Sequence, residues 1–125
     1  MQKNWGYTKL AAHTHAESID EMKHADLLID RILFLEGYPN PQRLHPLNIG
    51  EQVREQFQAD MAVEVRALET LRNGAAVCVA NNDTVTRLLL EGITRSEEEH
   101  IDYLETQLSL MDSLGDQLYL SQLDA

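Results

Sequence analysis

Apolar residues recur every three or four positions in three long segments of the chain, at residues 7–36, 51–80 and 84–114. This period places them on one face of an α-helix, so the pattern predicts three long helices. A shorter amphipathic segment at 116–123 predicts one or two further helical turns. The positions expected to face the interior are Leu10, Glu17, Glu21, His24, Leu28, Ile32 and Leu35 in the first helix, Val53, Phe57, Met61, Glu64, Leu68, Leu71, Ala75 and Cys78 in the second, and Leu90, Ile93, Glu97, His100, Leu104, Leu108 and Met111 in the third.

The first helix also carries a second apolar line on a different side, which includes Ile19, Met22, Ile29 and Leu33. A helix of a small bundle normally buries one stripe. We therefore expect this helix to bury one face in its own bundle and the other against something else.

Turn-forming residues mark the ends of these helices. Gly37 is expected to close the first helix and Gly115 the third, while Asn81-Asn82-Asp83 forms a short turn with an N-cap for the third helix. The prolines all lie between the first two helices, at Pro39, Pro41 and Pro46. A linker of about a dozen extended residues reaches about 40 Å, which is roughly the length of the preceding helix. It can therefore cross the whole bundle and leave the first two helices parallel, an arrangement absent from simple up-down bundles.

Composition narrows the class of protein. With 125 residues the chain is expected to be a single domain, and its formal charge of −11 argues against a nucleic-acid partner. The charge fits either a protein that handles cations or a well-solvated acidic surface. Cys78 is the only cysteine, which excludes an intrachain disulfide and a four-thiolate zinc site. No apolar run is long enough to span a bilayer and no secretory leader is recognisable, so we predict a cytoplasmic protein without a membrane partner.

Two Glu-x-x-His motifs carry the candidate chemistry, one at Glu21 and His24 and the other at Glu97 and His100. Residues three apart share a helix face, so each motif presents a carboxylate and an imidazole to one point. A single motif of this kind is weak, and two among five histidines can arise by chance. Glu64 adds a third observation, because it interrupts an apolar stripe, where an unpartnered carboxylate is costly.

Distances along the helices test whether these side chains can meet. From the turn at Asn82, Glu64 lies about 27 Å away along one helix and Glu97 about 22 Å along the next, level within about one turn. If the first two helices are parallel, Glu21 and Glu64 also lie level. Bundles that hold two metal ions combine paired Glu-x-x-His motifs with single Glu residues in this way. The sequence therefore predicts a metal centre, with buried Glu and His paired to each other as the alternative.

The chain resembles the bacterioferritins, the haem-containing ferritins of bacteria, over essentially its whole length. The matching stretches are Asn4-Trp5-Gly6, residues 17–25, residues 31–37, residues 48–51 and residues 97–105. The resemblance implies an all-α, ferritin-like bundle with the long crossover. It also implies that Glu21 and Glu97 bridge two iron ions, that His24 is a ligand of one iron, and that Glu64 and His100 are ligands of the other. Met22 matches the axial ligand of a haem b shared between two subunits.

These roles imply a function. The resemblance points to iron storage, in which Fe(II) is oxidised by oxygen or peroxide at the two-iron centre and Fe(III) is stored as mineral in a cage of twenty-four identical subunits. The chain would then be a ferroxidase. Haem would carry electrons for iron release, with a bacterioferritin-associated ferredoxin as a partner. Both histidines must be neutral to bind metal, so loading should weaken at acid pH.

The sequence departs from the family in two places. A first helix, which supplies one more Glu ligand, precedes the Asn-Trp-Gly stretch in the family; we expect that this chain starts at an internal methionine of a longer protein, with a truncated chain as the alternative. Ala16 stands where some members carry a His that works with the residue at Asp20, so an inner-surface iron site would be weaker here.

Two other functions remain open: a rubrerythrin-like di-iron peroxidase and a non-catalytic subunit that only co-assembles. An oxygenase for a larger substrate is disfavoured because nothing indicates a pocket beyond the metals.

Overall fold

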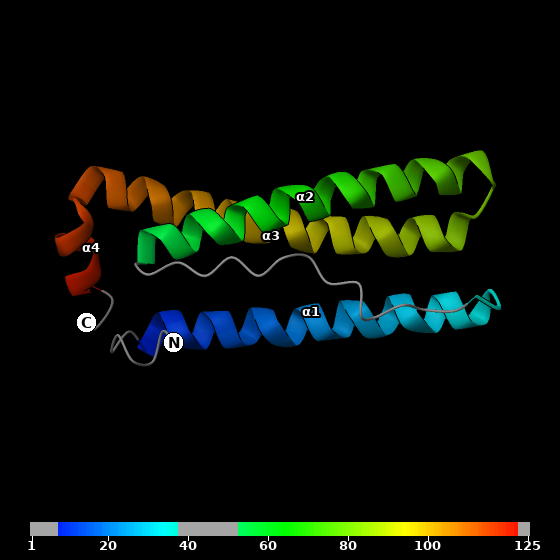
Figure 1. Ribbon diagram of the computed structural model, residues 1–125, viewed down its shortest axis with the longest axis horizontal. Helices are drawn as coiled ribbons and strands as arrows, with labels where there is room; N and C mark the ends of the chain where they lie inside the picture. Colours follow the sequence, from blue (N-terminus) through cyan, green and yellow to red (C-terminus); the bar gives the residue numbers. More distant parts are fainter. Residues whose placement is uncertain (1–7, 38–52, 123–125) are drawn as a thin grey trace. The chain divides into compact units, whose positions relative to one another are not determined.

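The computed structural model describes residues 8–37 and 53–122, and these residues form four helices joined by short turns and one undescribed stretch (Figure 1). The helices are α1 (Thr8–Phe34), α2 (Val53–Ala80), α3 (Thr84–Leu114) and α4 (Asp116–Gln122). Three long helices and a short fourth were predicted, and the predicted bounds of the third are those of α3. The predicted crossover and its three prolines fall on residues 38–52, outside the described residues.

The chain divides into two compact units. One contains α2 and most of α3, up to Met111; the other contains α1, α4 and the last residues of α3. None of the described helices is long and apolar enough to cross a membrane.

The turn between α2 and α3 is held by hydrogen bonds at both helix ends. Asn82 adopts a left-handed φ of 56°, and the amide of Asp83 donates to the carbonyl of Cys78 at 2.8 Å, as in a Schellman motif. Asp83 also begins the next helix, because its carboxylate accepts from the Thr86 amide at 3.2 Å and from the Thr86 hydroxyl at 2.6 Å. The predicted N-cap is confirmed, and so tight a turn makes α2 and α3 antiparallel.

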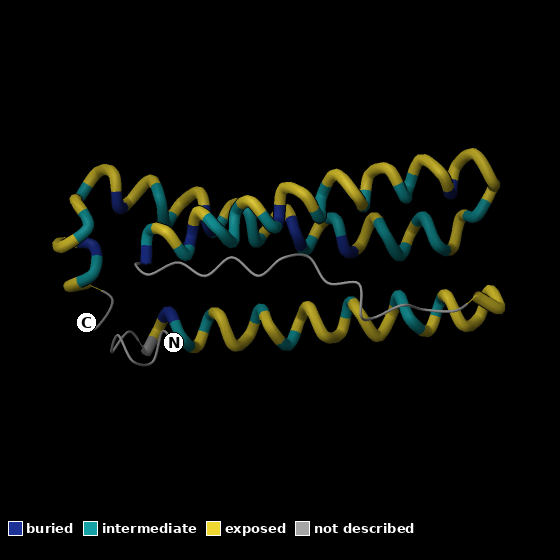
Figure 2. The backbone as a smooth tube through the Cα atoms, in the orientation of Figure 1, coloured by how far each residue is buried: buried dark blue, intermediate teal, exposed yellow. Residues whose placement is uncertain are grey.

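The stripes that the sequence predicted on α2 and α3 are buried or half-buried at every position (Figure 2). Phe57 and Leu104 are each 2 % exposed. Further along, a Cβ added at Gly74 would lie 3.1 Å from Cδ1 of Leu90, so the absence of a side chain lets the two helices approach closely. The other buried apolar residues of the pair are Val53, Cys78, Ile93 and Met111. Two buried carboxylates, Glu64 and Glu97, interrupt this apolar contact.

The ends of α1 and α3 differ in which residue turns the chain. Gly115 has a left-handed φ of 80° and ends α3 as predicted. At the end of α1, however, the left-handed residue is Glu36, with a φ of 63°, and Gly37 comes one position later. Gly37 donates to the carbonyl of Ile32 at 2.9 Å, and a Cβ there would lie 3.1 Å from Cγ2 of Ile32. The first helix therefore closes at Gly37 as predicted, through the hydrogen bond of Gly37 to Ile32, while the left-handed conformation falls on Glu36.

Burial along α1 is lower than the sequence predicted. Leu10 is buried at 2 % exposure, and Leu28 is half-buried. Ile32 and Leu35 are exposed, at 37 % and 52 %, although both belong to the predicted interior stripe. Leu35 lies beyond the last helical residue, Phe34, so it no longer follows the helical face on which the prediction placed it.

Candidate metal centre

Three of the predicted ligands lie together between α2 and α3. Glu64 comes from the middle of α2, while Glu97 and His100 come from successive turns of α3. One ligand atom of each lies within 4.8 Å of those of the other two. Both carboxylates are buried, at 7 % exposure for Glu64 and 3 % for Glu97. The antiparallel turn at residues 81–83 places Glu64 and Glu97 level with each other along the two helices, as the distances along the chain predicted.

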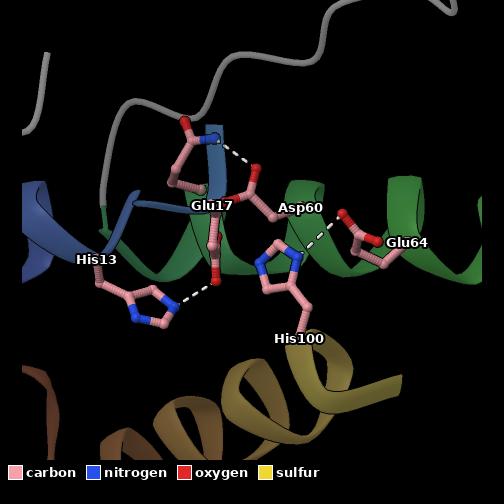
Figure 3. A network of polar contacts seen from close by, with 6 residues as sticks. His13, Glu17, Asp60, Glu64 and His100 are labelled. Carbon is pink, nitrogen blue, oxygen red and sulfur yellow. Dashed lines mark hydrogen bonds and ion pairs between the residues drawn. The ribbon is translucent and has the colours of Figure 1, made fainter. Parts of the chain in front are cut away.

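The geometry of Glu64 and His100 suits two ligands of one cation. Oε1 of Glu64 lies 3.1 Å from Nδ1 of His100, and Figure 3 shows the two side chains reaching toward each other from α2 and α3. Two ligand atoms about 2.1 Å from a metal and at right angles to each other are about 3 Å apart. The same separation also allows a hydrogen bond between the two side chains. The arrangement is therefore compatible with both interpretations that the sequence left open.

Burial favours the metal interpretation. Oε2 of Glu64 is buried and has no hydrogen-bond partner within the part of the chain that the structure describes. A carboxylate oxygen withdrawn from water without a partner is unfavourable by several kcal/mol or changes its protonation state. A cation between the helices would compensate for that cost, and two carboxylates with an imidazole are ligands that iron accepts. The residues present therefore fit a transition-metal ion.

The other two predicted ligands, Glu21 and His24, lie on α1 in the other unit. Their three-residue spacing places them on one face of the helix. His24 is half-buried and Glu21 is exposed. Between them in sequence, Met22 is 61 % exposed and so lies on the accessible surface of α1. That all five ligands join in one centre stays a prediction, as does the role of Met22.

The structure also shows a polar pair on α1 that the sequence analysis did not single out. Nε2 of His13 contacts Oε1 of Glu17, four residues later, and both side chains are half-buried (Figure 3). The available signal was the spacing of four between an imidazole and a carboxylate. That signal is weak in a chain with 21 acidic residues. A similar pair on α2, in which the Gln56 amide donates to Asp60 at 2.9 Å, contains no imidazole.

Comparison with known proteins adds independent information. The ferritin family, described as a ferritin-like domain, matches residues 1–114. Bacterioferritin BfrA of Mycobacterium tuberculosis is 57 % identical over 122 residues, which cover 98 % of this chain and 77 % of the relative. Bacterioferritin of Streptomyces coelicolor is 52 % identical over 97 % of this chain and 72 % of its own length. The solved structure of M. tuberculosis BfrA superposes with a TM-score of 0.95, at 57 % identity, over 98 % of this chain and 77 % of that one.

Fold, sequence and candidate centre thus agree. The predicted all-α, ferritin-like class is confirmed, and so is the predicted class of function, iron storage in a cage built from many copies of one subunit. Identity above half, over nearly the whole chain, is far beyond what a shared fold alone requires. This chain belongs to the bacterioferritins.

Proposed function

We propose that this chain is a ferroxidase, which oxidises Fe(II) at a two-iron centre and passes Fe(III) to a mineral store inside a cage of twenty-four copies. The ligands of the proposed centre are Glu21, His24, Glu64, Glu97 and His100. The observation that carries the proposal is the buried group of Glu64, Glu97 and His100 between α2 and α3, in which one carboxylate oxygen of Glu64 has no hydrogen bond from the described residues.

Each side chain has a defined task in this proposal. Glu97, buried at 3 % exposure, would hold both ions together with Glu21. Glu64 and His100 bind one ion, and His24 binds the other. The carboxylates stabilise the more highly charged Fe(III), because hard anionic oxygens prefer it, while the imidazoles also hold Fe(II). Two iron ions held there supply the electrons that reduce oxygen or peroxide.

The apolar walls of the α2–α3 pair assist this chemistry. Ile93 and Leu104 lie one to two turns before and after the ligands of α3 and are buried. They exclude water from the carboxylates, and charge interactions strengthen where water is excluded. The ligands are therefore held by packed helices and not by loops, which keeps their geometry defined when cations bind.

We extend the proposal to haem b, which Met22 would hold through its thioether sulfur. The support in this chain is that Met22 projects from α1 with 61 % of its surface exposed, so its thioether sulfur is open to a group shared with a second subunit. A haem held there would carry electrons inward for iron release, and a bacterioferritin-associated ferredoxin would donate them. The cytoplasmic location predicted from the sequence stays a prediction.

Rapid mixing of the Fe(II)-loaded protein with oxygen tests the ferroxidase proposal. The protein is first loaded with two Fe(II) per chain in the absence of oxygen. When oxygen is then mixed in, we expect a fast phase of Fe(II) oxidation and a matching consumption of oxygen. His100→Ala should remove the fast phase, while His15→Ala, an exposed histidine of α1, should retain it. A wild-type protein without a fast phase would instead be the non-catalytic, co-assembling subunit. Faster turnover with peroxide but no iron retention would favour the rubrerythrin-like peroxidase.

A further inference from the structure

The His13–Glu17 pair of α1 lies outside the proposed two-iron ligands and has no part in the function described so far. Its imidazole nitrogen and carboxylate oxygen are already in contact, and the two side chains keep 35 % and 22 % of their surface exposed. They are therefore shielded enough to be held in place and open enough for an ion to arrive from water.

A spacing of four on a helix gives these two residues the geometry of a chelating pair. Side chains at positions i and i+4 lie one above the other, about 5–6 Å apart at their Cβ atoms. One nitrogen and one oxygen donor from the same helix can then bind a single ion without any change of backbone. Imidazole with carboxylate favours divalent transition metals, because imidazole suits iron and zinc better than it suits magnesium or calcium.

The position of the pair along α1 places it next to two predicted ligands of the two-iron centre. The stripe continues from His13 and Glu17 to Glu21 and His24 in steps of four, four and three residues, so all four side chains share one helical face. Glu17 precedes Glu21 by one turn, about 6 Å along the axis. An ion bound by His13 and Glu17 is therefore one helical turn from a predicted ligand of the two-iron centre.

We propose that His13 and Glu17 form a second cation site, which binds one divalent transition-metal ion such as Fe(II) with water as its remaining ligands. This site is separate from the two-iron centre. Only the transfer of an ion from this site to that centre rests on the proposed function. With two protein ligands it binds more weakly than the centre, so an ion can be passed on.

Cobalt(II) provides a probe that oxygen does not oxidise readily and that can be counted by titration calorimetry and visible absorption. We expect the wild-type protein to bind one more Co(II) per chain than His13→Ala. Glu17→Gln, which keeps the size of the side chain and its ability to hydrogen-bond, should lose the same equivalent. His15→Ala is the matched control, because it removes an exposed histidine two residues away on another face and should keep the full count. A pair that merely stabilises the helix would leave all four counts equal, and that result would overturn the proposal.

A second background separates this site from the two-iron centre. In protein carrying Glu97→Gln and His100→Ala, the count should still fall by one when His13→Ala is added. No further fall in that background would mean that the lost equivalent belonged to the centre, which also overturns the proposal. If the wild-type chain binds only the one ion that His13→Ala removes, the second site stands and the two-iron centre fails.

Discussion

The α2–α3 pair and helix α1 differ in how far their apolar residues are buried. Along α2 and α3 the residues of the predicted stripes are buried or half-buried, and the carboxylates Glu64 and Glu97 are buried among them. Among the α1 residues whose burial is described, only Leu10 has less than a tenth of its surface exposed, whereas Phe34 is 73 % exposed. Further large apolar residues that lie exposed are Met22, Leu27, Ile32 and Leu33 of α1, and Leu35 just beyond its end.

This difference indicates that burial between α2 and α3 stabilises the single subunit, whereas the exposed apolar side chains of α1 are available for contacts with other subunits. A three-residue turn joins α2 to α3, so their mutual burial needs little loop closure. The apolar side chains of α1 are exposed within a single subunit of a family that assembles into cages. We therefore expect substitutions in α2 and α3 to act on the free energy of unfolding, and substitutions on the exposed line of α1 to act on assembly.

Substitution of the two phenylalanines of the chain should give the largest difference in unfolding free energy between the two regions. Phe57 of α2 is 2 % exposed, so Phe57→Ala should lower the free energy of unfolding by about 3–5 kcal/mol through lost burial and the cavity left behind. Phe34 ends α1, and Phe34→Ala should lower it by less than about 1 kcal/mol, the scale of its contact with Arg31, whose guanidinium lies 4.9 Å from the ring centre.

Chemical denaturation of dissociated subunits measures both effects, and size-exclusion chromatography of the assembled protein shows any change in the cage. Equal losses of unfolding free energy from the two substitutions would break the contrast. A smaller oligomer with Phe34→Ala, at unchanged subunit stability, would sharpen it.

Glu64 gives the next largest effect, and one of opposite sign. Glu64→Leu should raise the free energy of unfolding of the metal-free protein by about 1 kcal/mol, because it removes the desolvation cost of a buried carboxylate whose Oε2 has no partner among the described residues, and we expect this gain to exceed the loss of the Oε1 contact with His100. The same substitution should reduce the thermal stabilisation that Co(II) gives the wild-type protein and leave only the part that arises from ions bound outside the centre, since a folded state is stabilised only by the ions that it binds. Melting curves with and without Co(II) test both statements. Glu69→Leu, at an exposed position of the same helix, is the control and should keep the response to Co(II). A less stable metal-free Glu64→Leu would mean that the carboxylate is already well satisfied by the protein.

Sequence alone predicted most of the α2–α3 pair, because every relevant signal there is local. The apolar period gave both helices, the Asn-Asn-Asp turn gave their direction and the cap, and a carboxylate in an apolar stripe identified Glu64. These features need no knowledge of any other segment. Two Glu-x-x-His motifs and level positions along the helices then led to Glu97 and His100.

Prediction was weaker on α1, for physical reasons. Burial of Ile32 and Leu35 depends on what lies against the helix, which the helical period does not reveal. The left-handed turn fell on Glu36 and not on Gly37, because the hydrogen bonds of the Schellman motif select a position in the last turn even where a side chain makes that conformation costly. The His13–Glu17 contact was missed since imidazole and carboxylate four residues apart are common on acidic helices.

The cap at Asp83 predicts a smaller effect on the α2–α3 pair. Asp83→Ala should lower the free energy of unfolding by about 1 kcal/mol, because the first turn of α3 loses its acceptor for the Thr86 amide. Asp83→Asn should cost only a few tenths of that, since asparagine caps about as well. Denaturation of the two variants side by side gives the comparison. A similar loss in both would indicate that the charge of Asp83, and not its hydrogen bond, stabilises the turn.

The smallest expected effect concerns the exposed ion pair that links α2 to α3 beside the centre. Arg72 Nη2 lies 3.9 Å from Glu98 Oε1, and the side chains are 65 % and 57 % exposed. At such exposure the attraction is screened by water and salt, so a double-mutant cycle with Arg72→Ala and Glu98→Ala should give a coupling of less than about 0.5 kcal/mol, which declines further in 0.5 M salt. Because Glu98 projects away from its buried neighbour Glu97, both variants should also bind Co(II) like the wild-type protein. A coupling above about 1 kcal/mol, or lost metal in either variant, would show that the surface of this pair and its buried ligands act together, which the burial pattern argues against.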